Sequence, residues 1–121
     1  MSKLSEKRGL KMAGILELDV GHISSELSLH EMLGAVFGFP GWYGKNFDAL
    51  WDSLTDPEQS SLPEVLLLRS FDILEKRLGE RAGILRHILA DLPSRRPVTV
   101  IVCDEAGQEL ARWPPISAPA P

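Results

Sequence analysis

The sequence predicts an α/β fold in which a three-stranded parallel sheet packs against about four helices. Three short apolar runs, within residues 12–20, 64–68 and 98–103, have the composition of strands. Two stretches of helical periodicity separate each run from the next, and strands connected through helices form parallel sheets. The 121 residues are the length of one domain, which is long enough to bury a core without disulfides or metals.

The N-terminal part of the chain supplies the first strand and the first helix. Residues 1–11 are polar and unpatterned, so we expect a mobile N-terminal tail that precedes a domain at 12–103. Ser28 and Glu31 have the spacing of a helix-capping box. The apolar side chains between 29 and 37 then trace one helical face, and Gly38 suits the left-handed position that ends a helix.

A loop and a short second helix follow at residues 39–56. Pro40 and the two glycines that follow it are turn formers. Asn46 is predicted to cap the helix, because its side-chain oxygen accepts a backbone N–H of the first turn. The apolar face of the helix contains Phe47, Leu50 and Leu54, and Pro57 ends it.

The C-terminal half of the chain is predicted to contain two strands, two helices and a tail. The four apolar residues at 65–68 predict a strand that is covered on both faces. Two helices are expected at 71–78 and 80–92, with a break at Gly79, before the strand at 98–103. Residues 104–121 are rich in proline and are predicted to be an extended or disordered C-terminal tail, which Trp113 docks locally.

Composition narrows the function classes. The chain has a net charge of −4, a single cysteine (Cys103), and no signal peptide or membrane-spanning run, so we expect a cytoplasmic protein that is monomeric when free. Residues 46–75 contain seven acids and one base, which disfavours direct binding of nucleic acid.

Catalytic and cofactor motifs are not found in the sequence. The three histidines lack metal-ligand spacing, Cys103 has no base nearby in the sequence, and no phosphate-binding glycine motif occurs, so we expect no metal, cofactor or catalytic residue. Asp48 and Asp52 could form an acid–base pair in a small hydrolase. We disfavour this alternative, because two carboxylates on one exposed helix share a similar environment.

The second helix has an acidic stripe that stability alone does not explain. Asp48, Asp52 and Asp56 are spaced at i, i+4 and i+8, and like charges at this spacing destabilise a helix by roughly 0.2–0.5 kcal/mol per pair. An exposed, solvated helix face is one interpretation. Trp42 and Trp51 favour another, because aromatic anchors beside unpaired charge are typical of a protein interface.

The same stretch resembles a known family. The run Tyr43-Gly44-x-Asn46-x-Asp48-Ala49-Leu50-Trp51-Asp52-x-Leu54-Thr55 is similar to the signature of the barstar family of intracellular ribonuclease inhibitors. A matching proline precedes it, the order of elements agrees, and the resemblance extends over about 12–103. It implies the barstar-like fold.

The resemblance also implies a function. It indicates a non-catalytic ribonuclease inhibitor or immunity protein of a toxin–antitoxin pair, whose acidic helix and preceding aromatic loop block the basic active site of a cognate ribonuclease or nuclease-type toxin. By resemblance, Asp52 stands in for a substrate phosphate and Asp48 supports it. Asp91 is nearest to the second acidic contact of the family, displaced by one residue. The implied partner-binding residues are Trp42, Tyr43, Gly44, Asn46, Asp48, Trp51, Asp52, Thr55 and Asp91.

Three positions depart from the family pattern, namely Gly41, Asp56 and Pro57. They leave the mode of binding intact but leave the partner open. A barstar-like module that binds a partner other than a nuclease therefore remains as an alternative.

Overall fold

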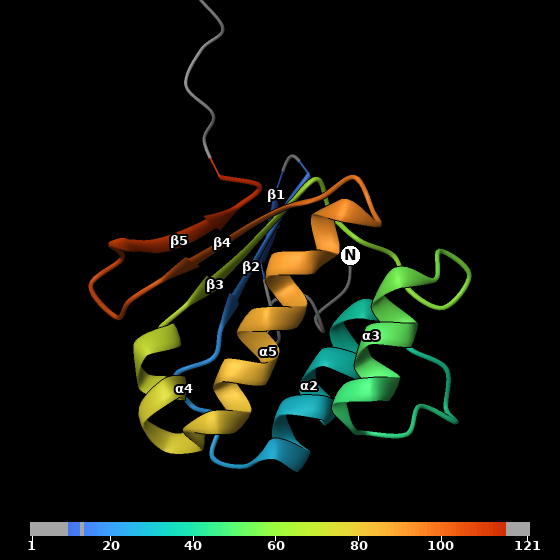
Figure 1. Ribbon diagram of the computed structural model, residues 1–121, viewed down its shortest axis with the longest axis horizontal. Coiled ribbons are helices and arrows are strands. Elements are labelled where there is room, and N and C mark those ends of the chain that lie inside the picture. Colours follow the sequence, from blue (N-terminus) through green and yellow to red (C-terminus); the bar gives the residue numbers. More distant parts are fainter. Residues whose placement is uncertain (1–9, 13, 116–121) are drawn as a thin grey trace, which may run out of the picture.

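The computed structural model describes residues 10–12 and 14–115, which form one mixed sheet with helices on one side of it (Figure 1). The five strands lie side by side in chain order: β1 (Leu10–Met12), β2 (Ile15–Asp19), β3 (Val65–Arg69), β4 (Thr99–Cys103) and β5 (Glu109–Trp113). The helices in this part of the chain are α2 (Glu26–Phe37), α3 (Phe47–Thr55), α4 (Phe71–Leu78) and α5 (Glu80–Asp91), which continues into a 3-10 turn at Leu92–Ser94.

The three central strands confirm the predicted parallel arrangement. Leu16 of β2 pairs with Leu66 of β3, which pairs in turn with Val100 of β4. Each connection between them contains two helices, α2 and α3 first and α4 and α5 second.

The prediction of three strands, all parallel, was wrong at the two edges. β1 pairs antiparallel with β2, and β5 pairs antiparallel with β4. Neither strand carries a strong apolar signal of its own, since β1 is three residues long and β5 contains Glu109 and Arg112. Such segments form strands because a neighbouring strand offers an open edge of N–H and C=O groups.

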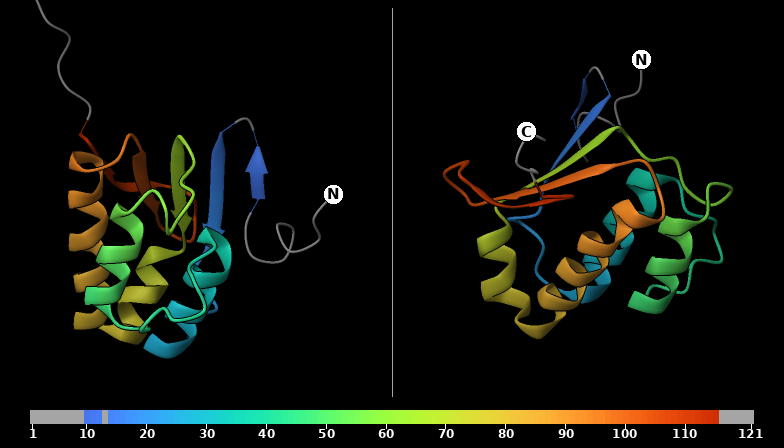
Figure 2. Two further views of the ribbon diagram at one scale, coloured as in Figure 1. Left: turned by 90° about the vertical axis from the view of Figure 1, so that its right-hand side faces the viewer. Right: turned by 45° about the horizontal axis from the view of Figure 1, so that its top comes forward.

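The core lies on one face of the sheet. Alternate residues of the parallel strands are buried and the residues between them are half-buried or exposed, except that Cys103 at the end of β4 is buried next to Val102. In β3, for example, Leu66 and Leu68 are buried and Leu67 is not. The expectation that this strand is covered on both faces was therefore wrong, because all four helices pack on the same side (Figure 2).

The first helix begins three residues earlier than predicted. Its N-cap is Ser25, whose hydroxyl accepts a hydrogen bond from the backbone N–H of Ser28 at 3.1 Å. Ser28 returns the contact, since its own hydroxyl accepts from the N–H of Ser25 at 3.2 Å. Ser28 thus closes a capping box as its third helical residue, whereas we had predicted it as the cap. Gly38 ends the helix with φ of 73°, as predicted.

The region predicted as the C-terminal tail contains part of the sheet. Trp113, in β5, packs against the core, and the guanidinium of Arg86 lies 5.7 Å from its ring centre. Residues 1–9 and 116–121 of the two predicted tails lie outside the described residues.

Candidate protein-binding site

Helix α3 is oriented by its apolar face. Leu50 and Leu54 are fully buried and Phe47 packs against the core from its edge. The period of 3.6 residues turns Asp48 and Asp52 away from the core, and both are exposed. The predicted acidic face is confirmed for Asp48 and Asp52. The prediction was wrong for Asp56, which follows the helix as its extended C-cap and accepts a hydrogen bond from the N–H of Glu58 at 2.8 Å.

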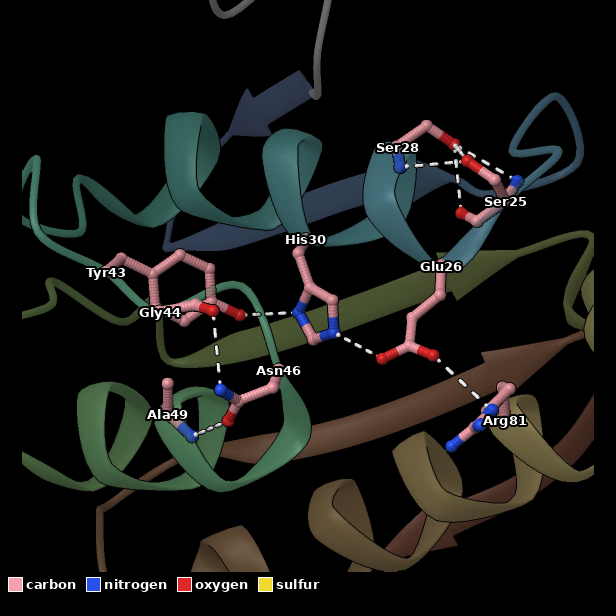
Figure 3. Close-up of polar contacts among 9 residues, drawn as sticks. All are labelled: Ser25, Glu26, Ser28, His30, Tyr43, Gly44, Asn46, Ala49 and Arg81. Carbon is pink, nitrogen blue, oxygen red and sulfur yellow. Dashed lines mark hydrogen bonds and ion pairs between the residues drawn. The ribbon is translucent and has the colours of Figure 1, made fainter.

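The start of α3 is fixed by local contacts that the sequence predicted. The side-chain oxygen of Asn46 accepts a hydrogen bond from the N–H of Ala49 at 2.8 Å, and its side-chain nitrogen donates to the carbonyl of Gly44 at 3.3 Å (Figure 3). A Cβ on Gly44 would lie 3.3 Å from that nitrogen and 3.4 Å from the Cβ of Ala49. Such contacts are tight, so glycine lets the loop pass close to the first turn of the helix.

The end of α3 is held by residues from elsewhere in the chain. Arg96 donates to the carbonyl of Leu54 at 2.8 Å, and the hydroxyl of Ser60 donates to the carbonyl of Ser53 at 2.6 Å. No base lies in the last turn of the helix itself. Arg96 supplies the positive charge that favours the C-terminal end of a helix, which counters the unfavourable position of Asp52.

A groove of about 850 Å³ lies between α3 and α5. Helix α3 contributes Phe47, Asp48, Trp51 and Asp52 to its lining. Helix α5 contributes one face that runs from Glu80 to Asp91, the predicted second acidic position. The structure thus brings together four of the nine predicted site residues: Asp48, Trp51, Asp52 and Asp91.

Four carboxylates line the groove, and no lysine or arginine is among the described residues that line it. Two carboxylates on α3 face the groove together with two on α5, Glu80 and Asp91. None of the ion pairs found within residues 14–115 involves any of these four carboxylates. Arg95 lies at the edge of the aromatic lining, with its guanidinium 5.6 Å from the ring centre of Trp51. The groove is therefore suited to a positively charged protein surface.

The loop before α3 places its two aromatic residues differently. Trp42 is 72% exposed, so its indole is available for contact. Tyr43 is buried, and its hydroxyl lies 2.5 Å from Nδ1 of His30 in α2. Its phenol therefore faces the protein interior, and it can act on a partner through the position of the loop. Thr55, at the far end of α3, uses its hydroxyl to donate to the carbonyl of Trp51 at 2.8 Å.

His30 joins the loop to the helices. Its Nε2 lies 3.3 Å from one carboxylate oxygen of Glu26, and the other oxygen of Glu26 lies 3.4 Å from Nε of Arg81 (Figure 3). A neutral ring that donates from Nε2 to Glu26 and accepts at Nδ1 from Tyr43 satisfies both contacts. Burial lowers the pKa of His30, while the nearby Glu26 opposes that shift. Burial also raises the pKa of Tyr43, which keeps its hydroxyl protonated and able to donate.

The single cysteine of the chain, Cys103, is not placed for nucleophilic chemistry. Cys103 is buried, and burial raises the pKa of its thiol, which disfavours the nucleophilic thiolate. In the part of the chain that the structure describes, no group of three or more His, Cys, Asp or Glu side chains is arranged to hold a metal ion. No described helix is long and apolar enough to cross a bilayer.

Comparison with known proteins places the chain in a family. The sequence model of the family described as "Barstar (barnase inhibitor)" matches residues 13–106, which is most of the chain. The chain belongs to the barstar family. The matched region contains both helices of the groove and the loop before α3.

A curated relative supports the same barstar assignment. The chain is 36% identical over 63 residues to a Bacillus subtilis (strain 168) protein named "Putative ribonuclease inhibitor YrdF". The aligned part covers 52% of this chain and 67% of that protein.

The α5 side of the groove was largely missed by the sequence interpretation. Ile84, His87 and Ile88 line the groove, together with Glu80 and Gly83. The signal that could have located them is the spacing of residues 80, 84, 87, 88 and 91, which share one helical face. That face is recognisable as functional only once α3 is known to lie beside it.

Proposed function

We propose that this protein is a non-catalytic inhibitor that blocks the active site of a ribonuclease with helix α3 and the loop before it. One observation carries the proposal. Asp48 and Asp52 are exposed beside Trp51, face a groove with further carboxylates, and have no ion-pair partner within residues 14–115. Membership of a family described as barnase inhibitors supports this proposal.

The physical basis is mimicry of the substrate. A ribonuclease binds the phosphates of RNA with arginine, lysine and histidine side chains, and a fixed carboxylate can accept the same charge-assisted hydrogen bonds. We assign the phosphate-like position to Asp52 and a supporting position to Asp48. Trp42 and Trp51 flank them as aromatic contacts, and the exposure of Trp42 suits this role.

The remaining predicted residues act through α3 and its loop. Asn46 and Gly44 set the start of the helix, Tyr43 anchors the loop on His30, and Thr55 bonds the helix backbone. Asp91 offers a carboxylate from the opposite wall of the groove. A cytoplasmic location and an immunity function, in which the inhibitor protects the cell that makes the nuclease, complete the proposal.

The test is binding and inhibition of barnase and of ribonucleases of the same type by the wild-type protein and the Asp52→Ala variant. We expect the substitution to weaken binding by at least about 2 kcal/mol, roughly 30-fold in Kd, because it leaves the bases of the nuclease site unpaired. Glu105→Ala is the matched control, since Glu105 is an exposed acid in the turn between β4 and β5 and lies outside the groove.

A nucleotide bound in the nuclease active site should compete with the inhibitor. Unchanged affinity of Asp52→Ala would refute the assigned role of Asp52. Binding that persists when a nucleotide occupies the nuclease site would instead support a barstar-like module with a different target. Hydrolytic turnover that Asp48→Asn and Asp52→Asn both abolish would support an enzyme and refute the proposal.

A further inference from the structure

The α5 wall gives the groove a chemical character beyond its negative charge. Between the carboxylates lie apolar side chains: Phe47 and Trp51 on α3, and Ile84 and Ile88 on α5. Ile84 is 38% exposed and lies in the groove lining with Ile88, so both add apolar surface between the carboxylates. A phosphate-like carboxylate surface needs no such apolar floor.

Position 83 adds space to the same wall. Gly83 lies inside α5, where glycine costs roughly 0.5–1 kcal/mol relative to alanine. A Cβ built there would meet nothing within 4 Å, so the helix is not packed against another element at this point. The groove wall is therefore open at this position, where glycine weakens the helix.

We infer that the groove between α3 and α5 receives an apolar side chain of the bound protein, flanked on both sides by basic residues of that protein. This inference rests on the proposed function and specifies the chemistry of the partner surface. The apolar side chain covers Trp51, Ile84 and Ile88. The flanking bases pair with Asp48 and Asp52 on one wall and with Glu80 and Asp91 on the other.

Charge complementarity identifies the occupant. Four carboxylates without an ion pair in the described part of the chain attract cationic groups on both rims. The apolar floor excludes a purely hydrophilic occupant, because its exposed area is covered favourably only by apolar surface. A volume of about 850 Å³ accommodates several side chains of one segment, and the groove is continuous with the Asp48–Asp52 surface of α3.

Two synthetic peptides test the inference directly: acetyl-Lys-Arg-Phe-Arg-Lys-amide and its counterpart with serine in place of phenylalanine. Titration is followed by the amide resonances of the protein. We expect the phenylalanine peptide to shift residues 83–88 and 47–52 and to bind at least about tenfold more tightly than the serine peptide, because only the former covers the apolar floor.

A leucine placed inside and outside the groove provides a matched pair. Gly83→Leu should fill the groove and weaken binding of the phenylalanine peptide by at least about tenfold. Gln108→Leu adds a leucine at an exposed position between β4 and β5, outside the groove, and should leave that binding unchanged. Ile84→Ser, which removes apolar floor without adding bulk, should also bring the two peptides closer in affinity. Retained thermal unfolding and spectra of each variant confirm that it is folded.

Equal binding of the two peptides would overturn the inference, as would full affinity of a folded Gly83→Leu variant or the absence of shifts in the groove. These results are distinguishable from failure of the ribonuclease proposal. If the peptide contrast is observed but no ribonuclease binds through Asp52, only the ribonuclease proposal fails. If a ribonuclease binds through Asp52 without the peptide contrast, only the groove inference fails.

Discussion

His30 is a buried titratable residue that links three parts of the molecule. It lies in α2, contacts Tyr43 of the binding loop through Nδ1, and packs edge-on against Phe47 of α3 with ring centres 4.8 Å apart. Its second nitrogen contacts Glu26. The loop and the start of the acidic helix therefore rest on one imidazole, which must be neutral to accept the hydrogen bond from Tyr43.

We predict that protein stability decreases on acidification because of this residue. Burial sets the pKa of His30 in the folded protein below its ordinary value of 6.5, so the unfolded chain binds a proton more readily. Stability should therefore be fully present above pH 6.5 and be lost as the pH falls below it toward the folded pKa, by up to about 1.4 kcal/mol per pH unit. Urea unfolding at pH 7.5, 6.5 and 5.5 measures the effect.

A histidine outside the core is the control. His22→Gln should retain the pH dependence, because His22 is exposed, whereas His30→Gln should lose most of it. An unchanged pH dependence in a folded His30→Gln variant would assign the effect to other groups.

At the scale of single elements, α3 is a short helix that depends on its ends. It has nine residues and carries an acidic stripe, so its own propensity contributes little to its stability. Its start is capped by Asn46, and its end is bonded by Arg96 and Ser60. The acidic surface is thus presented on a helix fixed at both termini, which reduces the ordering that binding would otherwise require.

We predict that Asn46→Ala destabilises the protein by about 1 kcal/mol, because it removes the acceptor for the N–H of Ala49. Asn46→Asp, which retains a capping oxygen, should lose much less. Chemical denaturation measures both variants. A stability loss in Asn46→Asp as large as that in Asn46→Ala would argue that the contact of the side-chain nitrogen with Gly44 dominates over the cap.

The features of single helices that the sequence predicted correctly are those that depend on interactions between neighbouring residues. The Asn46 cap, the Gly38 end and the break at Gly79 were predicted because each depends on a few neighbouring residues. The cap of α2 was misassigned to Ser28, because the side chains of Ser25 and Ser28 can both cap a helix. The structure distinguishes them, since the backbone of Ser25 is extended and its hydroxyl accepts a hydrogen bond from the N–H of Ser28.

At the scale of the whole molecule, the sheet extends past the region matched by the family. β5 lies at 109–113, whereas the family match ends at 106 and the domain boundary predicted from sequence is 103. β5 covers the open edge of β4, and its Ala111 and Trp113 pack against the core. The folded unit therefore includes β5 and extends beyond residue 103.

We predict that truncation after Cys103 destabilises the protein by roughly 2 kcal/mol or more, because it uncovers the edge of β4 and removes the apolar surface of Trp113. Truncation after Pro115 is the control, since it retains β5, and we expect it to have much less effect on the unfolding temperature. Equal stability of the two truncated proteins would support a domain that ends at 103.

The sequence by itself determined the central parallel strands, the apolar face of α3 and the acidic positions Asp48 and Asp52, because periodicity and capping are properties of neighbouring residues. Only the tertiary structure decided the edge strands, the single covered face of the sheet and the inward position of Tyr43. It also brought Ile84, His87 and Asp91 to the acidic helix. These features depend on which elements lie side by side, and the packing of α5 against α3 places residues more than 30 positions apart in one groove.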